Sequence, residues 1–542
     1  MNSTEEITTQ PAENIDSVIK IKQPNRLWLL VLVLGLVFDF LFWDNPIGVN
    51  YAIFSMLCLV GGLYFLFSEG YRSSLNSLWL LIPFVFFVVT TFLRQEPLTS
   101  FLAYTFTLFT IGVFINTYLG GRWFQYSLTD YAGKFFQIIG SMLTIQKRFV
   151  FQIRQEKKAQ GGTENKIPFV AILRGLLIAL PIVVIFAMLL ASADVVFNQR
   201  ITDFFDIFDS EKITEYVFRF FIILTCAFLL VGIYLHTISQ SKDEKLASEV
   251  AGSKKQFLGF TEASIVLGSV TLLFLMFVII QFQYFFGGQS NIGVAGYTYS
   301  QYARRGFSEL VTVAFFSLLL IMGLGTITKR QKEIEQKVYS WLSIAIVLQV
   351  LVILTSAYQR LALAIDWHGF SRLRLYPQVF LVWVGILFIA IVVLEFFHLE
   401  SYFAFAFVLA SLGFAISLTL FNVDAAIVKR NISRVALGKN LNVGHLTSLS
   451  TDAIPALVEA YQSQNMPETT REGIGAILAC YLSENESIEK SDDWRSFNYS
   501  YWKASQLLAE MKPFLTTYRV SGSGSSLRVR TPSNVLYECR EY

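Results

Sequence analysis

The residues best suited to chemistry lie between Gly287 and Gly325, where a loop rich in glycine and aromatic residues leads into a long apolar run. Arg304 and Arg305 precede this run, and Glu309 lies at its beginning. If a helix begins early, Arg305 and Glu309 lie one turn apart on the same face, which is the spacing of a helical ion pair. Because charge at a membrane edge is costly without a partner, these residues predict a functional site.

Further charged residues join this group if the loops that carry them share one side of the membrane. Arginine donates two parallel hydrogen bonds to a phosphate or carboxylate, so the set predicts a site for an anionic head group. The predicted set is Asp194, Arg304, Arg305, Glu309, Asp366, Arg372 and Arg374. The alternative is that these arginines pair with the three acidic residues and lock the loops, or contact lipid phosphates non-specifically. Asp366 and His368 beside Arg372 also suit acid–base chemistry, with loop anchoring as the alternative.

Charged residues in or at the ends of apolar runs form a third group: Asp39, Arg174, Arg219, Glu262 and Glu395. Charges within spans mark ion or substrate paths in transporters. Near a helix end, however, a long side chain can extend its charge to the interface, which removes much of the cost. Asp39 and Glu395 are the strongest candidates for a direct role.

Catalytic signatures are missing from the sequence, which has no P-loop, no HExxH zinc motif and no GxSxG nucleophile motif. The four histidines and four cysteines lack the spacing of a metal site. We therefore predict no catalytic residue, no metal and no cofactor, which favours a protein that is not an enzyme. No basic stripe is interleaved with aromatics, so membrane lipids rather than nucleic acid are the expected partners.

The composition indicates a membrane protein. Of 542 residues, 54% are hydrophobic and 15% are charged, whereas soluble domains carry about 25% charged residues. Runs of the length that crosses a bilayer predict an all-α polytopic membrane protein with about eleven spans between residues 27 and 421. The expected spans are 27–43, 47–68, 77–93, 98–118, 168–191, 214–236, 261–286, 309–326, 338–358, 376–396 and 403–421.

Lysine and arginine in the connections predict the orientation, because short cytoplasmic loops carry an excess of both. The basic loops, which fall on one side of an eleven-span bundle, are 119–167, 237–260 and 327–337. Residues 1–26, expected to be disordered, then also lie in the cytoplasm. The segments expected outside are 192–213, 287–308, 359–375 and the C-terminal region 422–542.

Two connections contain amphipathic segments. In the loop 119–167, the residues from Asp130 to Arg154 place apolar side chains on one helical face. This pattern predicts a helix on the inner leaflet, which either senses lipid or a partner or is a linker held on anionic lipid. Its apolar face comprises Phe135, Ile138, Ile139, Met142, Ile145, Phe149 and Ile153. Outside, residues 197–208 predict a second interfacial helix with an acidic wet face.

Hydropathy drops from Asn422 onward, and the remaining residues suffice for one small, mainly helical soluble domain. Three segments predict helices: LSTDAIPALVEAYQSQ, TREGIGAILACYLSE and DDWRSFNYSYWKASQLLAEMK. Two short β-prone pieces near the C-terminus flank a Ser/Gly turn and predict a hairpin. Cys480 and Cys539 either pair in a disulfide or remain thiols, because sequence alone cannot supply the geometry.

Several stretches from the fifth expected span onward resemble a bacterial family of polytopic membrane proteins that is known only as a domain of unknown function. The stretches are LLASADVVF, YARRGFSEL, HGFSRLRLY, NVDAAIVKRNISR, LSTDAIPAL and DWRSFNYSYWKA. The resemblance implies an integral protein of the bacterial inner membrane with a soluble C-terminal region. It implies no activity.

Two functions remain open. The first is a non-enzymatic envelope protein that binds an anionic lipid, or a protein partner through residues 422–542, at the outer face of the membrane. The alternative is a membrane-embedded transporter or transferase for lipid-linked or anionic substrates. Many spans followed by an outer soluble domain are similar to lipid-sugar-dependent glycosyltransferases. Those enzymes usually carry a catalytic acid in a long first outer loop, which here is only WDNPIG with Asp44.

Overall fold

The chain forms two compact units of α-helices, seen in a computed structural model. The structure describes residues 20–159, 210–242, 257–286, 307–439, 441–487, 493–522 and 526–539, with single residues between 186 and 200. Unit 1 comprises Met1–Asp44, Phe54–Arg72 and Phe136–Lys242. Unit 2 comprises Asn45–Ile53, Ser73–Phe135 and Asp243–Tyr542.

Ten helices among the described residues are long and apolar enough to cross a membrane. They correspond to ten of the predicted spans, and the remaining one, at 168–191, lies almost entirely outside the described residues. Large apolar side chains on these helices are uncovered, such as Leu29 at 66% and Leu272 at 69% exposed, which suits contact with lipid. The prediction of an all-α polytopic membrane protein is confirmed.

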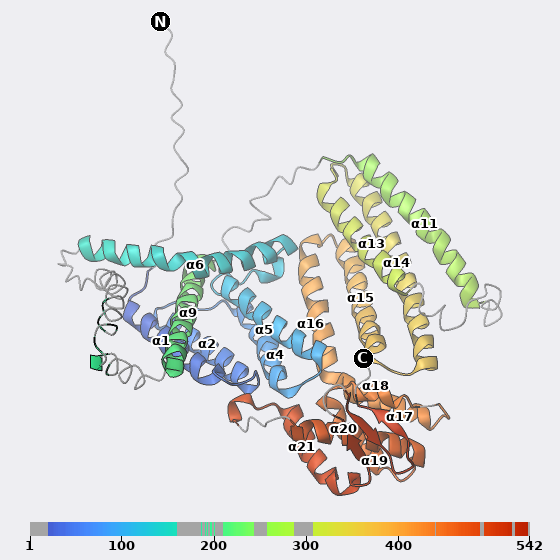
Figure 1. Ribbon diagram of the computed structural model, residues 1–542. Coiled ribbons are helices and arrows are strands. Elements are labelled where there is room, and N and C mark those ends of the chain that lie inside the picture. The colour runs from blue at the N-terminus through green and yellow to red at the C-terminus, as the bar shows by residue number, and fades with distance from the viewer. Residues whose placement is uncertain are drawn as a thin grey trace. The chain divides into compact units, whose positions relative to one another are not determined.

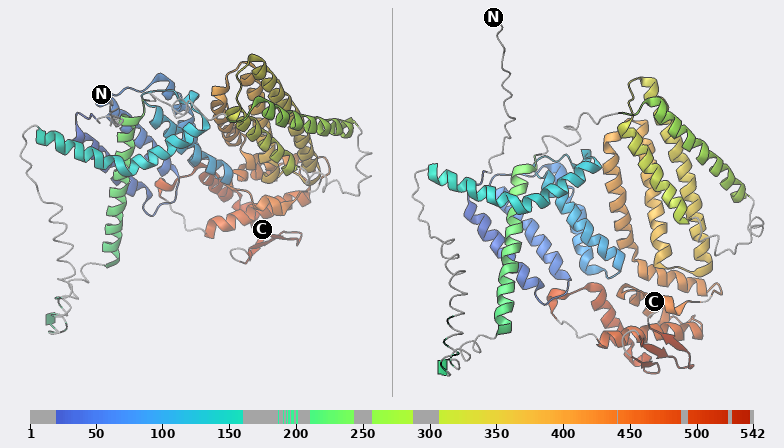
Figure 2. Two further views of the ribbon diagram at one scale, coloured as in Figure 1. Left: turned by 90° about the horizontal axis from the view of Figure 1, so that it is seen from above. Right: turned by 45° about the horizontal axis from the view of Figure 1, so that its top comes forward.

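Unit 1 is built around the long spanning helix α9 (Ser210–Gln240). The other helices of the unit are α1 (Pro24–Phe42), α2 (Val49–Ser68) and α6 (Leu128–Ala159), of which α2 and α6 begin in unit 2. α1 packs along α9, and a Cβ at Gly35 of α1 would lie 2.7 Å from the Ile223 oxygen. Tyr234 of α9 donates a hydrogen bond of 2.9 Å to the Cys58 carbonyl of α2. The unit 1 part of α6 crosses α9 rather than running alongside it (Figures 1 and 2).

Unit 2 contains the remaining spanning helices. They are α3 (Leu75–Leu78) with α4 (Leu81–Leu93), α5 (Pro97–Thr117), α11 (Phe260–Phe286), α13 (Phe307–Ile327), α14 (Glu333–His368), α15 (Arg372–Phe396) and α16 (Phe403–Phe421). Helix α14 packs against α11, α13 and α15, and α16 packs against both α15 and α5 (Figure 1). Short 3₁₀ turns, η1 (Trp123–Gln125) and η4 (Glu400–Tyr402), meet at one end of these helices.

The loop expected at 359–375 is much shorter in the structure than predicted. α14 continues to His368, and only Gly369, Phe370 and Ser371 separate it from α15. The helix continues because apolar residues recur on one side, including buried Leu361 and Ile365. It ends at Gly369, whose φ of 85° is readily adopted by glycine alone.

The C-terminal domain packs four main helices around an apolar core. Its elements are α17 (Val423–Val435), α18 (Val443–Thr447), η5 (Thr451–Ala453), α19 (Ile454–Gln462), α20 (Glu468–Ser487), η6 (Trp494–Ser496), α21 (Tyr499–Met511), η7 (Lys512–Leu515), β1 (Arg519–Ser521), β2 (Arg528–Arg530) and β3 (Leu536–Glu538). The strands form one antiparallel sheet in the order β1-β2-β3, so the predicted hairpin gains a third strand. Cys480 of α20 and Cys539 after β3 form a disulfide.

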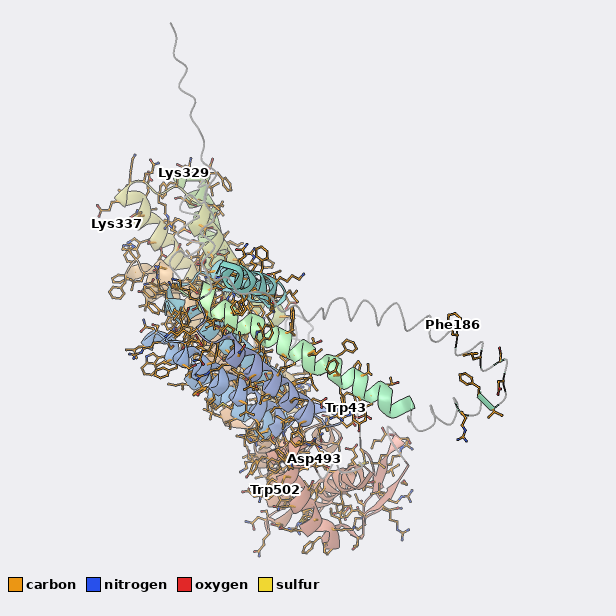
Figure 3. All side chains as sticks on the ribbon, turned by 90° about the vertical axis from the view of Figure 1, so that its left-hand side faces the viewer. Trp43, Phe186, Lys329, Lys337, Asp493 and Trp502 are labelled. Carbon is orange, nitrogen blue, oxygen red and sulfur yellow. A yellow bond between two sulfur atoms is a disulfide. The ribbon has the colours of Figure 1, made fainter. Side chains whose placement is uncertain are left out.

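The C-terminal domain lies at one end of the unit 2 spanning helices (Figure 2). Figure 3 shows Lys329 and Lys337 at the opposite end from Asp493 and Trp502, which belong to the domain. The domain therefore meets the helix ends at three short turns, which follow α4, precede α15 and follow α16. These turns position the polar residues described next.

Candidate functional site

The turn between α4 and α5 begins the site, because its polar groups are buried against the C-terminal domain. Glu96 is only 1% exposed. Its carboxylate caps α5 by accepting hydrogen bonds from Leu98 N at 3.0 Å and Thr99 N at 2.7 Å. Pro97 occupies the first helical position, where a missing N–H is tolerated. The sequence Glu-Pro thus produces a sharp, capped helix start.

Asp452 of the C-terminal domain binds the same turn. Its Oδ2 accepts hydrogen bonds of 2.9 Å from the backbone N–H groups of Gln95 and Glu96. Arg94 lies 3.8 Å from its other oxygen. Burial raises the pKa of the Asp452 carboxyl, although the hydrogen bonds from Gln95 and Glu96 and the charge of Arg94 oppose this shift. Asp452 therefore attaches η5 to the α4–α5 turn.

A buried ion pair joins the first turn of α15 to the first turn of α17. Arg372 Nε donates to Asp424 Oδ1 at 2.8 Å, and its Nη2 donates to Oδ2, so the guanidinium and carboxylate form a two-pronged pair. Asp424 is completely buried and also accepts hydrogen bonds from the backbone N and hydroxyl of Ser450 at 2.7 and 2.6 Å. Arg372 Nη1 donates to the Ser448 carbonyl at 3.2 Å.

Tyr376 connects these contacts into one network. It lies one turn after Arg372 on α15, and its hydroxyl donates to the Glu96 carboxylate. We name the whole set the junction cluster: Arg94, Glu96, Arg372, Tyr376, Asp424, Ser450 and Asp452. The cluster holds the ends of three spanning helices, α4, α5 and α15, and the C-terminal domain together.

Three further side chains, those of Asn422, Asn431 and Arg434, reinforce this arrangement. Asn422, between α16 and α17, has a left-handed backbone with φ of 43°, and its side chain caps α17 by accepting from Ala425 N at 3.3 Å. Asn431 exchanges two hydrogen bonds with the backbone of Phe370, of 2.9 and 2.8 Å. Arg434 donates to the Asp366 carbonyl at 2.6 Å. α17 is therefore fastened along the α14–α15 turn.

The chemistry open to the junction cluster is limited. Each of its three carboxylates accepts at least two hydrogen bonds from backbone N–H groups, hydroxyls or a guanidinium. A carboxylate engaged in this way is poorly placed to act as a nucleophile or a base. No group of three potential metal ligands occurs in the described part of the chain. The geometry therefore suits fixing two parts of the molecule together.

The predicted arginines on α15 are already engaged by protein groups. Arg372 binds Asp424 rather than any acidic residue of the predicted set. Arg374 donates to the Gly369 carbonyl at 2.9 Å. Asp366 contributes its backbone carbonyl, which accepts the hydrogen bond from Arg434. The structure thus brings these three residues together around the α14–α15 turn, with contacts that anchor loops.

Of the rest of the predicted set, Glu309 and Asp194 are described, and each has contacts near its own position. Glu309 is exposed in the first turn of α13 and accepts from Ser308 Oγ at 3.0 Å. Asp194 belongs to unit 1, where it accepts from the backbone N–H groups of Val196 and Phe197 at 2.7 and 2.9 Å. Arg304 and Arg305 lie outside the described residues, so their role stays a prediction.

Three of the charges predicted within spans, Asp39, Arg219 and Glu395, have identified partners. Arg219 of α9 binds Asp39 of α1 through Nη2 at 2.6 Å and also contacts Glu215 at 3.3 Å. Trp43 lies against the same guanidinium, 5.2 Å from its carbon to the ring centre. Glu395 accepts from Ser340 Oγ of α14 at 2.7 Å. Asp39 and Arg219 were expected separately, and the structure pairs them across two helices.

Glu96, Asp424 and Asp452 were missed by the sequence analysis. The last two lie within stretches that carried the family resemblance, NVDAAIVKRNISR and LSTDAIPAL. Each follows a residue that can cap a helix, Asn422 or Ser450 respectively, which is the only local signal. Glu96 precedes proline, which also indicates a helix start.

The fold and the site define a multi-pass helical membrane protein with a C-terminal domain fastened to its helix ends. Residues 81–460 match the family described as DUF4153, a domain of unknown function, and the chain belongs to that family. No curated protein and no solved structure matches the chain. The matched range contains every residue of the junction cluster.

Proposed function

We propose that this protein is a non-enzymatic component of a bacterial cell envelope, which spans the inner membrane and binds an anionic lipid or a protein partner at its extracytoplasmic face. The junction cluster carries this proposal. It fixes the C-terminal domain directly to the ends of α4, α5 and α15, whereas a flexible linker would let the domain move away. A domain fixed in this way suits recognition of a partner at the membrane surface.

The proposed orientation places the N-terminus in the cytoplasm and the C-terminal domain outside. Lys329 and Lys337 lie at the end of unit 2 opposite to that domain, and basic residues favour the cytoplasmic side (Figure 3). The Cys480–Cys539 disulfide gives independent support, because disulfides persist in oxidising compartments outside the cytoplasm.

Exposed arginines on the sheet of the C-terminal domain support the proposal that the partner is anionic. Arg519 and Arg530 lie directly opposite each other on β1 and β2, and both are exposed. Like charges in this position are unfavourable, so a bound anion would relieve the repulsion. Arg528 is already paired with Glu538 at 2.9 Å. Since Arg372 is engaged by Asp424, this pair of arginines is the better candidate for contact with the partner.

The test is binding of anionic vesicles by the full chain held in phosphatidylcholine nanodiscs. We expect wild type to co-sediment with phosphatidylglycerol vesicles at low salt, and the Arg519→Ala/Arg530→Ala variant to lose this binding. Lys332→Ala/Lys337→Ala removes two cations from the opposite end and should bind like wild type. If wild type does not bind the vesicles, the lipid partner is excluded. The proposal as a whole is contradicted if cross-linking in cells from position 521 also captures no protein that depends on the two arginines.

A transporter or transferase for lipid-linked or anionic substrates is the alternative. The ion pair between Asp39 and Arg219 favours it, because paired charges within spans occur along transport paths. Uptake of a labelled anion into vesicles containing wild type, lost in Asp39→Asn, would support this alternative against the non-enzymatic binding protein.

A further inference from the structure

Helix α6 carries two apolar faces, of which α9 covers one. Ile138, Ile145 and Phe149 are buried. At the crossing point, a Cβ added to Gly232 of α9 would lie 2.5 Å from the Met142 Cα, so glycine permits the close approach. The apolar face that the sequence predicted to lie on the inner leaflet is thus only partly buried by protein, because Phe135 and Ile139 of that face are exposed.

A second apolar stripe on α6 is left uncovered. Phe136, Ile139 and Leu143 are 72%, 44% and 55% exposed. Their spacing of three and four residues places them on one side of the helix. Lys147 lies one turn after Leu143 on the same side and is also exposed. We call Phe136, Ile139 and Leu143 the α6 stripe.

The position of α6 indicates what covers this stripe. α6 contacts the last few turns of α9, where Gln146 donates to the Phe228 carbonyl at 2.8 Å and His236 hydrogen-bonds Ser141 at 2.8 Å. Figures 1 and 2 show it crossing the direction of α9, which places it along the membrane surface if α9 spans the bilayer. An apolar stripe flanked by a basic residue in this position suits the boundary between lipid head groups and acyl chains.

A second protein copy fits the stripe less well. Stable protein interfaces bury about 800 Å² on each partner, which is more than three partly exposed side chains on one helix offer. The polar side of the helix, with Gln137 and Thr144, is exposed as an interfacial helix requires. Lys147 and Arg148 add positive charge, which attracts anionic lipid.

We propose that the α6 stripe is inserted into the membrane surface, with Lys147 at the phosphates of anionic lipids. In the proposed orientation this surface is the cytoplasmic leaflet. α6 thereby connects the anionic lipids of that leaflet to unit 1, because its other face packs closely against α9 at Gly232. This inference uses no residue of the C-terminal domain, so it stands or fails separately from the partner proposed above.

The test uses the full chain with Cys58→Ala and Cys226→Ala, so that only an introduced thiol reacts while Cys480 and Cys539 stay paired. The environment-sensitive dye NBD is attached at Ile139→Cys in the stripe, or at Thr144→Cys on the polar side as the matched control. The protein is placed in vesicles of phosphatidylcholine with or without phosphatidylglycerol, and the vesicles carry a shallow nitroxide lipid as quencher.

We expect a blue-shifted, strongly quenched dye at position 139 and neither effect at position 144. Phosphatidylglycerol should raise the ratio of buried to exposed dye at 139. Lys147→Gln should lower this ratio about five-fold in phosphatidylglycerol vesicles, since each basic residue near an anionic surface contributes ~1 kcal/mol.

Three results would overturn the proposal. Equal and weak quenching at 139 and 144 would mean that the stripe is not in lipid. Burial at 139 that is lost when the protein is diluted into more lipid would assign the stripe to a second copy. Identical burial with and without phosphatidylglycerol would remove the anionic lipid from the proposal.

Discussion

At the scale of single residues, the junction cluster depends on three buried carboxylates, those of Glu96, Asp424 and Asp452. Asp424 is fully buried, and Arg372 together with Ser450 supplies its hydrogen bonds. Taking an ionised carboxylate out of water is strongly unfavourable unless it is paired and hydrogen-bonded. Removal of either member of the ion pair would therefore leave the other charge without its partner.

Asp424→Ala should loosen the C-terminal domain from the helix ends. It leaves the partly exposed Arg372 without its partner, and breaking a buried ion pair costs up to about 3–5 kcal/mol. Thermal unfolding and protease cleavage of the purified full chain would measure the effect. Glu459→Ala is the matched control, because it removes an acid from the exposed pair with Lys429 and should cost at most about 1 kcal/mol. Equal effects of the two substitutions would refute a special role for Asp424.

Asp452 should give the cluster a defined pH dependence. Burial raises its pKa in the folded protein, so the folded state holds this proton more tightly than the unfolded chain does. Stability therefore falls as the pH rises from the unfolded pKa through the raised folded pKa, and then levels off. Relative to Asp452→Asn, wild type should lose stability across that acid range in thermal unfolding at a series of pH values. A relative gain with rising pH would mean that the pKa is lowered instead.

At the scale of elements, helix crossings depend on small residues. Gly232→Ala inserts a methyl group 2.5 Å from the Met142 Cα, so α6 and α9 must move apart. We expect a loss of about 1–3 kcal/mol in unit 1, which is typical of overpacking. The measurement is the thermal midpoint of the full chain in detergent. Gly268→Ala in α11 is the control, because its Cβ meets nothing within 4 Å and alanine favours helix. If the control lowers the midpoint as much, the crossing is not the cause.

The elements were largely predictable, because each span is a local run of apolar residues that can be recognised without its neighbours. The pairing of elements was not. Arg372 and Asp424 are 52 residues apart, and no local pattern in either segment points to the other. For α6, the spacing identified the apolar residues but could not tell which of them α9 covers. Phe136 was left out of the predicted face, yet it is the most exposed residue of the stripe.

At the scale of the whole molecule, three features of unit 2 bear on its orientation in the membrane. The C-terminal domain is fastened to the helix ends by the junction cluster, a disulfide lies within it, and basic residues lie at the opposite end. These observations support the proposed orientation, in which the domain lies on the extracytoplasmic side. The proposed partner at the extracytoplasmic surface depends on this orientation.

The most direct test is therefore the side of the membrane on which the sheet lies. In a background of Cys58→Ala and Cys226→Ala, Ser521→Cys and Lys332→Cys are each treated in intact cells with a thiol reagent that cannot cross the inner membrane. We predict labelling at 521 and protection at 332 until the cells are opened. Labelling at 332 with protection at 521 would place the C-terminal domain in the cytoplasm and contradict the proposed function.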